Sequence, residues 1–232
     1  MSNGNSHAAS SSVEQNNASP QPNEAQLTAC AGEAAAASKA QIIQLPFGQQ
    51  AEHNGAFLML FCRYAQPYLD YDRPTLCAKN EAFPLVLVNC RWDHSFGFPG
   101  GKVDPGESLE EAALREAQEE IGLLVKRERL IPICSHSKAG SNFAAHLFAV
   151  ELNSAQMLEA IGNSWKAPDA VSEVLGVIAL RIDRNLTGKS YGIVDFVRRA
   201  PFSFTARHEL VLALERLELL AAEDLAVLKA LL

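Results

Sequence analysis

Three features of exported or membrane-bound proteins are absent from the sequence of 232 residues. No apolar run approaches the length of a bilayer-spanning helix. The N-terminus has no basic segment followed by an apolar one and is poor in arginine, so neither a secretory signal nor a mitochondrial presequence is predicted. We therefore expect a nuclear or cytoplasmic protein with no membrane partner.

Positive charge is also scarce. The chain has 20 lysines and arginines against 27 acidic residues, a net charge of −7 and a pI of about 5.4. Nucleic-acid-binding proteins usually carry a basic patch, and the acidic net charge of this chain gives no indication of one. Local patches can nevertheless differ in charge from the chain as a whole. The five cysteines form no Cys-x-x-Cys pair, which favours reduced, mostly buried thiols and argues against a structural zinc site.

The composition divides the chain near residue 45. Residues 1–45 are rich in Ser, Asn, Gln and Ala, so we expect a disordered low-complexity tail ahead of a domain at 46–232. Residue periodicity in the domain predicts strands at 55–64, 84–92, 96–103, 143–152 and 173–182, and helices at 154–161, 192–199 and 206–223. Strands and helices mix without a regular βαβ repeat, which favours an α/β sandwich with a mixed sheet.

A further helix is predicted between Ser108 and Gly122. Ser108 with Glu111 three residues later is a capping box, and Gly122 is placed to end the helix. One face carries an apolar stripe that is expected to dock on the sheet. The stripe consists of Ala113, Leu114, Ala117 and Ile121.

Glu116, Glu119 and Glu120 fall at i, i+3 and i+4 on another face of this helix. Three carboxylates so close repel one another, so a cation must compensate them or their pKa values must rise. A charged helix surface facing water is the alternative, but no lysine or arginine follows one turn on. Mg²⁺ takes oxygen ligands and commonly bridges carboxylates to substrate phosphates. The pattern therefore predicts a site for Mg²⁺ or Mn²⁺.

The complete spacing resembles the Nudix box. Gly101 is followed after five residues by Glu107, then after seven by Arg115-Glu116, and the pattern closes with Glu119-Glu120, Gly122 and Leu123. This resemblance implies a Nudix α/β/α sandwich with a mixed sheet, in which Glu116, Glu119 and Glu120 hold the metal and act in catalysis. The Gly101 turn lets the backbone approach a diphosphate, while Arg115 orients carboxylates that include Glu107.

The segments around the box resemble one branch of the Nudix enzymes, which decaps small nucleolar RNA and hydrolyses inosine diphosphates. The similar segments include "CRWDHSFGFPGGKVD", "CSHSKAGSNFAAHLFAVEL" and "FTARHELVLALERLELL", and the likeness spans residues 50–220. It implies a nucleotide or capped-RNA substrate, RNA binding and a homodimer.

The same resemblance implies roles for single residues. Arg91 and the strand with Gly100 and Gly101 line the nucleotide pocket, and Phe98 packs beside the base. Phe57 stands where the family has a purine-stacking histidine, so it can stack but donates no hydrogen bond.

For two further roles that the resemblance implies, a purely structural alternative stays open. Glu173 corresponds to an extra acidic residue near the metals, or else is an exposed glutamate at the start of a strand. His136 or His146 contacts phosphate, or else each is a histidine satisfied in the core. Basic clusters that can follow RNA, or simply face solvent, are Lys126, Arg127, Arg129, Arg198 and Arg199.

The functional interpretation is a metal-dependent pyrophosphohydrolase that cleaves a phosphoanhydride in a nucleoside diphosphate-linked substrate. An RNA 5′ cap and a (deoxy)inosine-type nucleotide are the expected substrates. A hydrolase of diadenosine polyphosphates or ADP-ribose is the first alternative, because the box recognises only the diphosphate. A non-catalytic RNA- or protein-binding Nudix protein is the second, and the intact glutamates argue against it.

Overall fold

The computed structural model describes residues 41–65, 82–168, 173–185, 187–190 and 192–232. Their centre is a mixed sheet with the strand order β1-β6-β7-β2-β3-β4, to which β5 adds by pairing with β2 and β8 by pairing with β3. All pairs are antiparallel except β2 with β7. The strands are β1 (Ile42–Leu45), β2 (His53–Ala65), β3 (Phe83–Arg91), β4 (Phe96–Gly97), β5 (Gly100–Lys102), β6 (Ile131–Lys138), β7 (Phe143–Glu151) and β8 (Val174–Arg181).

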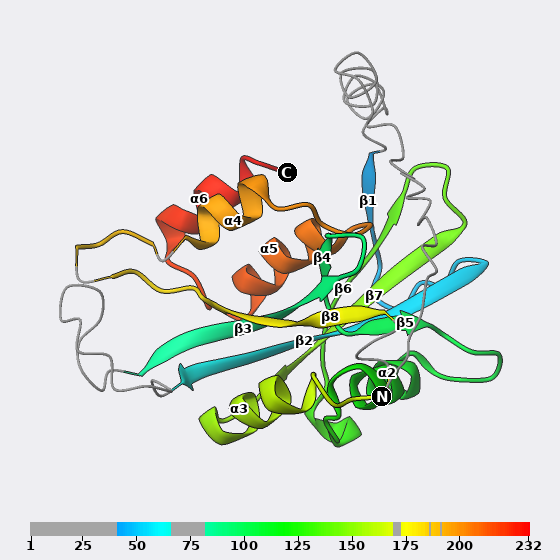
Figure 1. The fold of residues 1–232 in the computed structure, drawn as a ribbon. Coiled ribbons are helices and arrows are strands. Elements are labelled where there is room, and N and C mark those ends of the chain that lie inside the picture. The colour runs from blue at the N-terminus through cyan, green and yellow to red at the C-terminus, as the bar shows by residue number, and fades with distance from the viewer. Residues whose placement is uncertain (1–40, 66–81, 169–172, 186, 191) are drawn as a thin grey trace, which may run out of the picture. The chain divides into compact units, whose positions relative to one another are not determined.

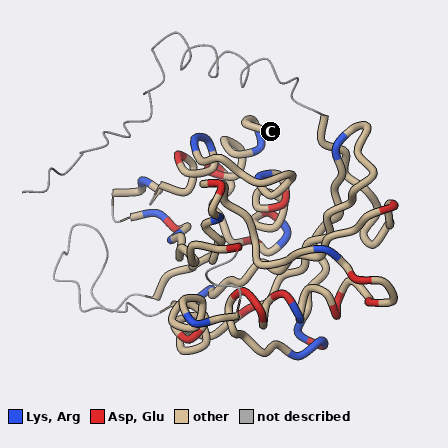
Figure 2. Tube along the Cα trace, turned by 45° about the vertical axis from the view of Figure 1, so that its right-hand side comes forward, with Lys and Arg blue, Asp and Glu red and all other residues tan. Residues whose placement is uncertain are grey.

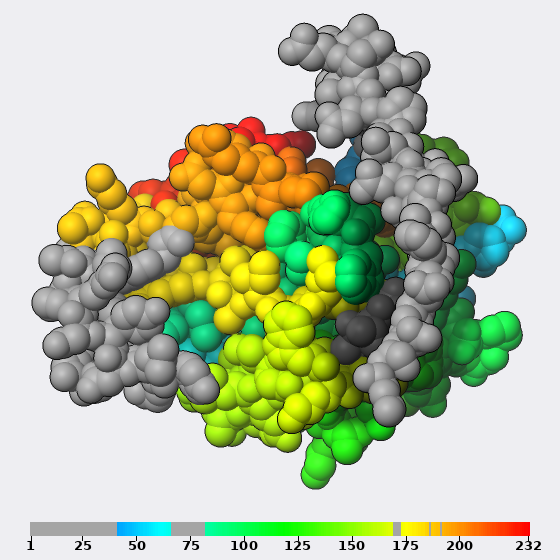
Figure 3. All heavy atoms as spheres, viewed as in Figure 1, coloured from blue at the N-terminus to red at the C-terminus, as the bar shows by residue number. Residues whose placement is uncertain are grey.

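Helices cover both faces of the sheet (Figure 1). On one face lie α2 (Leu109–Ile121) and α3 (Ser154–Asn163), and on the other lie α4 (Ile193–Arg199), α5 (Ala206–Arg216) and α6 (Ala222–Lys229). A single turn of 3₁₀ helix, η1 (Arg127–Arg129), follows α2. The space-filling view shows the orange and red C-terminal helices and the yellow-green α3 on opposite sides of the strands (Figure 3).

Successive residues of the central strands face opposite sides of the sheet and contribute to a hydrophobic core on each side. In β2, Leu58 and Leu60 face the core under α2 and α3, whereas Met59 and Phe61 face the core under α5. All four side chains are fully buried. Because successive strand residues point to opposite faces, a strand that is apolar at every position requires helices on both sides. The predicted α/β/α sandwich with a mixed sheet is confirmed.

Strand β6 was not predicted from the sequence. Its second half, Ser135-His136-Ser137, is polar but buried, so it shows no apolar run. Hydrogen bonds within the sheet compensate the burial: the Ser135 hydroxyl lies 2.7 Å from His146 Nδ1, and the Ser137 hydroxyl donates to the Phe143 carbonyl. The C-terminal prediction of one helix at 206–223 is also corrected, because the chain turns after Arg216 and a separate helix α6 follows.

The predicted boundary of the tail is too late. Residues 42–45, assigned above to a disordered tail, form β1 and pair with β6 in register from Ile42 opposite Lys138 to Leu45 opposite Ser135. Residues 1–40 lie outside the described residues, so the expectation for them stays a prediction. Within the described ranges, no helix combines the length and apolar composition needed to cross a bilayer.

The role of β1 gives a truncation test. A protein that starts at residue 46 lacks β1 and leaves the edge of β6 unpaired, so it should be less stable than one that starts at residue 41. Cross-strand pairs contribute a few tenths of a kcal/mol each, so we expect a loss of about 1 kcal/mol and a Tm lower by about 2–4 °C. Thermal unfolding of both proteins measures this difference, and equal Tm values would show that β1 contributes nothing.

Candidate active site

Helix α2 forms as its sequence predicts. The Ser108 hydroxyl accepts from the Glu111 amide at 3.2 Å, and the Glu111 carboxylate accepts from the Ser108 amide at 2.8 Å. The helix ends at Gly122, whose φ of 63° is left-handed, a conformation that glycine adopts without strain. Of the predicted apolar stripe, Leu114 is only half-buried, and Ala112 takes its place among the buried residues.

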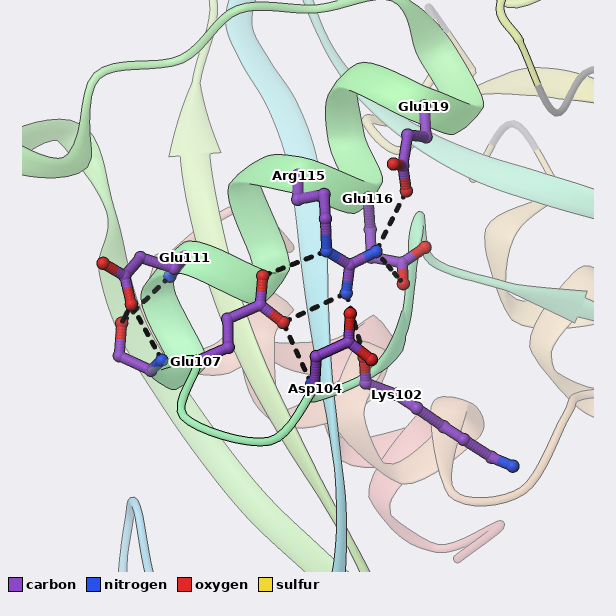
Figure 4. A network of polar contacts seen from close by, with 8 residues as sticks. Lys102, Asp104, Glu107, Glu111, Arg115, Glu116 and Glu119 are labelled. Atoms are coloured by element: carbon purple, nitrogen blue, oxygen red, sulfur yellow. Dashed lines mark hydrogen bonds and ion pairs between the residues drawn. The ribbon is translucent and has the colours of Figure 1, made fainter.

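Arg115 is the hub of the acidic cluster (Figure 4). Its Nε lies 3.0 Å from Glu107 Oε1, and its Nη1 lies 2.9 Å from both Glu116 Oε1 and Glu119 Oε2. Its Nη2 also donates to the Lys102 carbonyl at 3.0 Å. One guanidinium therefore compensates three carboxylates and ties α2 to the end of β5. The hydrogen bond from Arg115 lowers the pKa of Glu107, and these carboxylates raise the pKa of Arg115.

Glu120 lies beneath this cluster and is only 1% exposed. Its Oε2 accepts from Asn89 Nδ2 at 2.7 Å and from the Gly100 amide at 3.1 Å, while its Oε1 is buried without a hydrogen-bond partner. Burial raises the pKa of Glu120 to about 8, against the opposing effect of the Gly100 amide. Burial likewise raises the pKa of Glu116, although Arg115 acts in the other direction. The raised pKa values of Glu116 and Glu120 therefore come chiefly from burial, and neighbouring carboxylates add to them.

The strand with Gly100 and Gly101 packs closely against β2 and the Glu116 side chain. Gly100 has a φ of 148°, and a Cβ atom there would lie 2.6 Å from the Phe57 Cα and also against the Ala56 carbonyl. A Cβ at Gly101 would lie 2.7 Å from the carboxyl carbon of Glu116. Real Cβ contacts are longer, so any side chain at these positions would displace the backbone of β2 or the Glu116 carboxylate.

These elements border a cleft of about 680 Å³. Among the predicted site residues, the cleft is lined by Phe57, Arg91, Gly100, Gly101, Glu116, Glu119 and Glu173. The acidic residues that line it are Asp93, Asp104, Glu116, Glu119 and Glu173. In Figure 2 the red segments follow α2 and the loop before it. Glu173 is exposed in the cleft and is close enough to Glu116 to raise its pKa further.

Several residues of the cleft were missed from the sequence. They are Asp93, Lys102, Asp104, Phe143, Ser203 and Phe204, and Asn89 lies below them as the partner of Glu120. Phe143 and Phe204 are far apart in the chain, and no local pattern marks either. Only the strand register, which opposes Phe143 to His53 at the start of β2, brings the start of β7 to the cleft.

The structure does not bring Phe98 and His136 to the cleft. Phe98 lies between β4 and β5, is 4% exposed and belongs to the core under α5. His136 is also 4% exposed and faces a separate cavity of about 230 Å³ with His208. Burial lowers the pKa of His136 to about 4. The positions of Phe98 and His136 therefore give no support to the expected contacts with the base and with phosphate.

A divalent metal fits the chemistry of the acidic end. In the described part of the chain, no three acidic, histidine or cysteine side chains already converge as a finished metal site. Arg115 explains this, because it holds the carboxylates of Glu116 and Glu119 toward itself. The donor set is nevertheless composed of the oxygen ligands that Mg²⁺ and Mn²⁺ prefer, and Glu120 Oε1 is a buried oxygen without a partner. Binding a cation would require Glu116 and Glu119 to turn from Arg115.

The sheet, the two helical layers and the glutamate helix against a Gly-Gly strand define a Nudix hydrolase. The family described as "Nudt16-like: U8 snoRNA-decapping enzyme-like" matches residues 56–220. The chain belongs to this family.

Proteins similar to this chain carry different substrate names. A U8 snoRNA-decapping enzyme of Mus musculus is 34% identical over 148 residues, which cover 62% of this chain and 75% of the relative. An ADP-ribose pyrophosphatase of Methanocaldococcus jannaschii is 35% identical over 94 residues, 40% of this chain and 52% of the relative. A solved mutT/nudix family protein from Listeria innocua aligns with a TM-score of 0.49 at 18% identity, covering 73% of this chain and 96% of that one.

We expect alanine at Gly100 and alanine at Gly101 to cause different defects, one in stability and the other in turnover. Gly101→Ala meets the far end of the flexible Glu116 side chain, so it should lower turnover by orders of magnitude with little change in Tm. Gly100→Ala meets the backbone of β2 at a φ that an alanine rarely adopts, so it should lower Tm by several degrees. Kinetics and thermal unfolding of both variants test the arrangement. Normal turnover in Gly101→Ala would show that the Glu116 position is not needed.

Proposed function

We propose that this chain is a Mg²⁺- or Mn²⁺-dependent pyrophosphohydrolase that cleaves a phosphoanhydride in a nucleoside diphosphate-linked substrate. The substrates we propose are an RNA 5′ cap or a (deoxy)inosine-type nucleotide. The observation that carries the proposal is the acidic cluster of α2, packed against Gly100-Gly101 in a cleft that aromatic rings also line. Within this cluster, Glu120 Oε1 is buried without a hydrogen-bond partner. Homodimerisation and a nuclear or cytoplasmic location stay predictions.

The roles of the acidic residues follow from their positions. Glu116, Glu119 and Glu120 would hold the cation, which when bound lowers the pKa of water and offsets charge on phosphate oxygens. Arg115 orients Glu116 and Glu119 and holds Glu107 just before the N-terminal end of the helix. We assign Glu173, on the other side of the cleft at the start of β8, to receive a proton from the attacking water.

The residues that we assign to the base, called here the base end, are Phe57 and Arg91, which both line the cleft. The Phe57 ring lines the cleft, and stacking on it would bind any base because every base has a π-face. The Arg91 guanidinium can donate to O6 and N7 of inosine or guanosine, a geometry that arginine favours. Adenosine lacks the O6 acceptor. This end of the cleft therefore supports a preference for oxopurine substrates.

The decisive experiment compares Glu120→Gln with Glu110→Gln. Glu120→Gln removes charge but not volume and should lower turnover by orders of magnitude. Glu110, on the first turn of the same helix and paired with Arg127 at 3.6 Å, is the matched control and should retain activity. The assay covers capped RNA, IDP, GDP, ADP, diadenosine polyphosphates and ADP-ribose with Mg²⁺ or Mn²⁺. Wild-type turnover in Glu120→Gln would overturn the catalytic assignment.

The same panel tests the base end through Arg91→Ala. This variant should raise KM for IDP and GDP more than for ADP, since only the oxopurines offer O6 to the guanidinium. Equal effects on all three diphosphates would show that Arg91 does not read the base.

A further inference from the structure

Asn89 places a polar amide in the otherwise apolar inner part of β3. Leu85 and Leu87, which precede it on the same face of the strand, pack in the core under α2 and α3. Because side chains alternate between the two faces of a strand, Asn89 points toward the same side of the sheet. Its side chain is only 1% exposed, so it occupies a position where an apolar residue would continue the core.

The Asn89 side chain is hydrogen-bonded to Glu120. Asn89 Nδ2 donates to Glu120 Oε2 at 2.7 Å, and the Gly100 amide donates to the same oxygen at 3.1 Å. An ionised carboxylate only accepts hydrogen bonds, so the nitrogen of the Asn89 amide is the atom that faces it. Both donors therefore engage Oε2, and the lone pairs of Oε1 stay unused.

This buried pair is not fully satisfied. In the part of the chain that the structure describes, four buried side-chain atoms have no hydrogen-bond partner, and two of them are Asn89 Oδ1 and Glu120 Oε1. A buried polar atom without a partner costs free energy, whereas an apolar pair of similar shape can be neutral or stabilising. Stability alone therefore does not account for an amide at position 89.

The contact differs in charge from the contacts of Arg115. The Arg115 guanidinium orients Glu116 and Glu119 but also offsets part of their negative charge. The Asn89 amide is neutral, so it orients Glu120 and leaves the charge of the carboxylate intact. A neutral donor on one oxygen and a bare second oxygen are the arrangement that a cation ligand requires.

We propose that Asn89 is a positioning residue that holds Glu120 in the orientation in which its free oxygen binds the divalent cation. The inference rests on the proposed function, because it takes Glu120 as a ligand of that cation. It deepens the function by adding a residue on β3, outside the glutamate helix, that acts only through Glu120.

Mn²⁺ binding in the absence of nucleotide tests the inference independently of turnover. The free Mn²⁺ signal is followed by electron paramagnetic resonance during titration with the full chain. Asn89→Leu keeps the branched shape of the side chain but removes the donor, so it should raise the Kd for Mn²⁺ about 10- to 100-fold, the usual cost of losing the partner of a metal ligand. Asn89→Ala, which cannot overfill the site, should weaken binding in the same direction.

Leu87→Ala is the matched control. Leu87 lies two residues earlier on β3, faces the same core and is also 1% exposed. Its truncation should lower Tm because it opens a cavity in the core. The Kd for Mn²⁺ should stay close to that of the wild type, since no donor to Glu120 is lost. A loss of affinity equal to that of Asn89→Leu would overturn the inference.

Combining Asn89→Leu with Glu120→Gln distinguishes positioning from a general structural role. Two changes that remove the same interaction are not additive, whereas independent changes are. Glu120→Gln alone should weaken Mn²⁺ binding, and adding Asn89→Leu should then cause little further loss. Full additivity, or a wild-type Kd in both single Asn89 variants, would show that Asn89 does not act through Glu120.

The same titrations separate this inference from the proposed function. If Glu120→Gln binds Mn²⁺ as tightly as the wild type, Glu120 is not a ligand and the metal assignment of the proposed function fails. If Glu120→Gln weakens binding but Asn89→Leu and Asn89→Ala do not, only the role of Asn89 is overturned.

Discussion

The ion pairs of Arg115 are the interaction on which the rest of the site depends. One guanidinium reaches Glu107, Glu116 and Glu119 and also the backbone carbonyl of Lys102. It offsets the repulsion that would otherwise disfavour so many carboxylates on adjacent turns, and it fastens the helix to the end of the Gly-Gly strand. A single positive charge cannot neutralise three carboxylates, and Glu120 lies outside its reach. The cluster therefore retains the negative charge that attracts a divalent cation.

The sheet builds a cleft beside this local cluster. Strand β5 carries Gly100 and Gly101 between α2 and β2, so the Glu116 carboxylate and the Phe57 ring lie against adjacent residues of one strand. The parallel pairing of β2 with β7 brings Phe143 to the cleft, and the segment before α5 adds Ser203 and Phe204. On the proposed function, phosphate chemistry would take place beside the glutamates, and a base would stack on one of the rings.

The sequence predicts those parts of the protein that depend on short-range order. The capping box, the Gly122 end of α2 and the Nudix spacing are all set within 23 residues, and the structure has the helix where they place it. Phe98 and His136 were placed by resemblance, and the structure turns both away from the cleft. Phe143, Phe204 and Asn89 were missed because their contacts join segments far apart in the chain. Strand β6 was missed because the buried residues of its second half are polar, and Ser135 and Ser137 are hydrogen-bonded to the distant strand β7.

Mn²⁺ binding shows whether the glutamates of α2 form a metal centre. The electron paramagnetic resonance signal of free Mn²⁺ is recorded during titration with protein in the absence of nucleotide. Wild-type protein and Glu110→Gln should reduce the free signal equally. The combined variant Glu116→Gln, Glu119→Gln and Glu120→Gln should leave it almost unchanged, because the oxygen ligands lose their charge. Equal Mn²⁺ binding by the combined variant and the wild type would contradict the account.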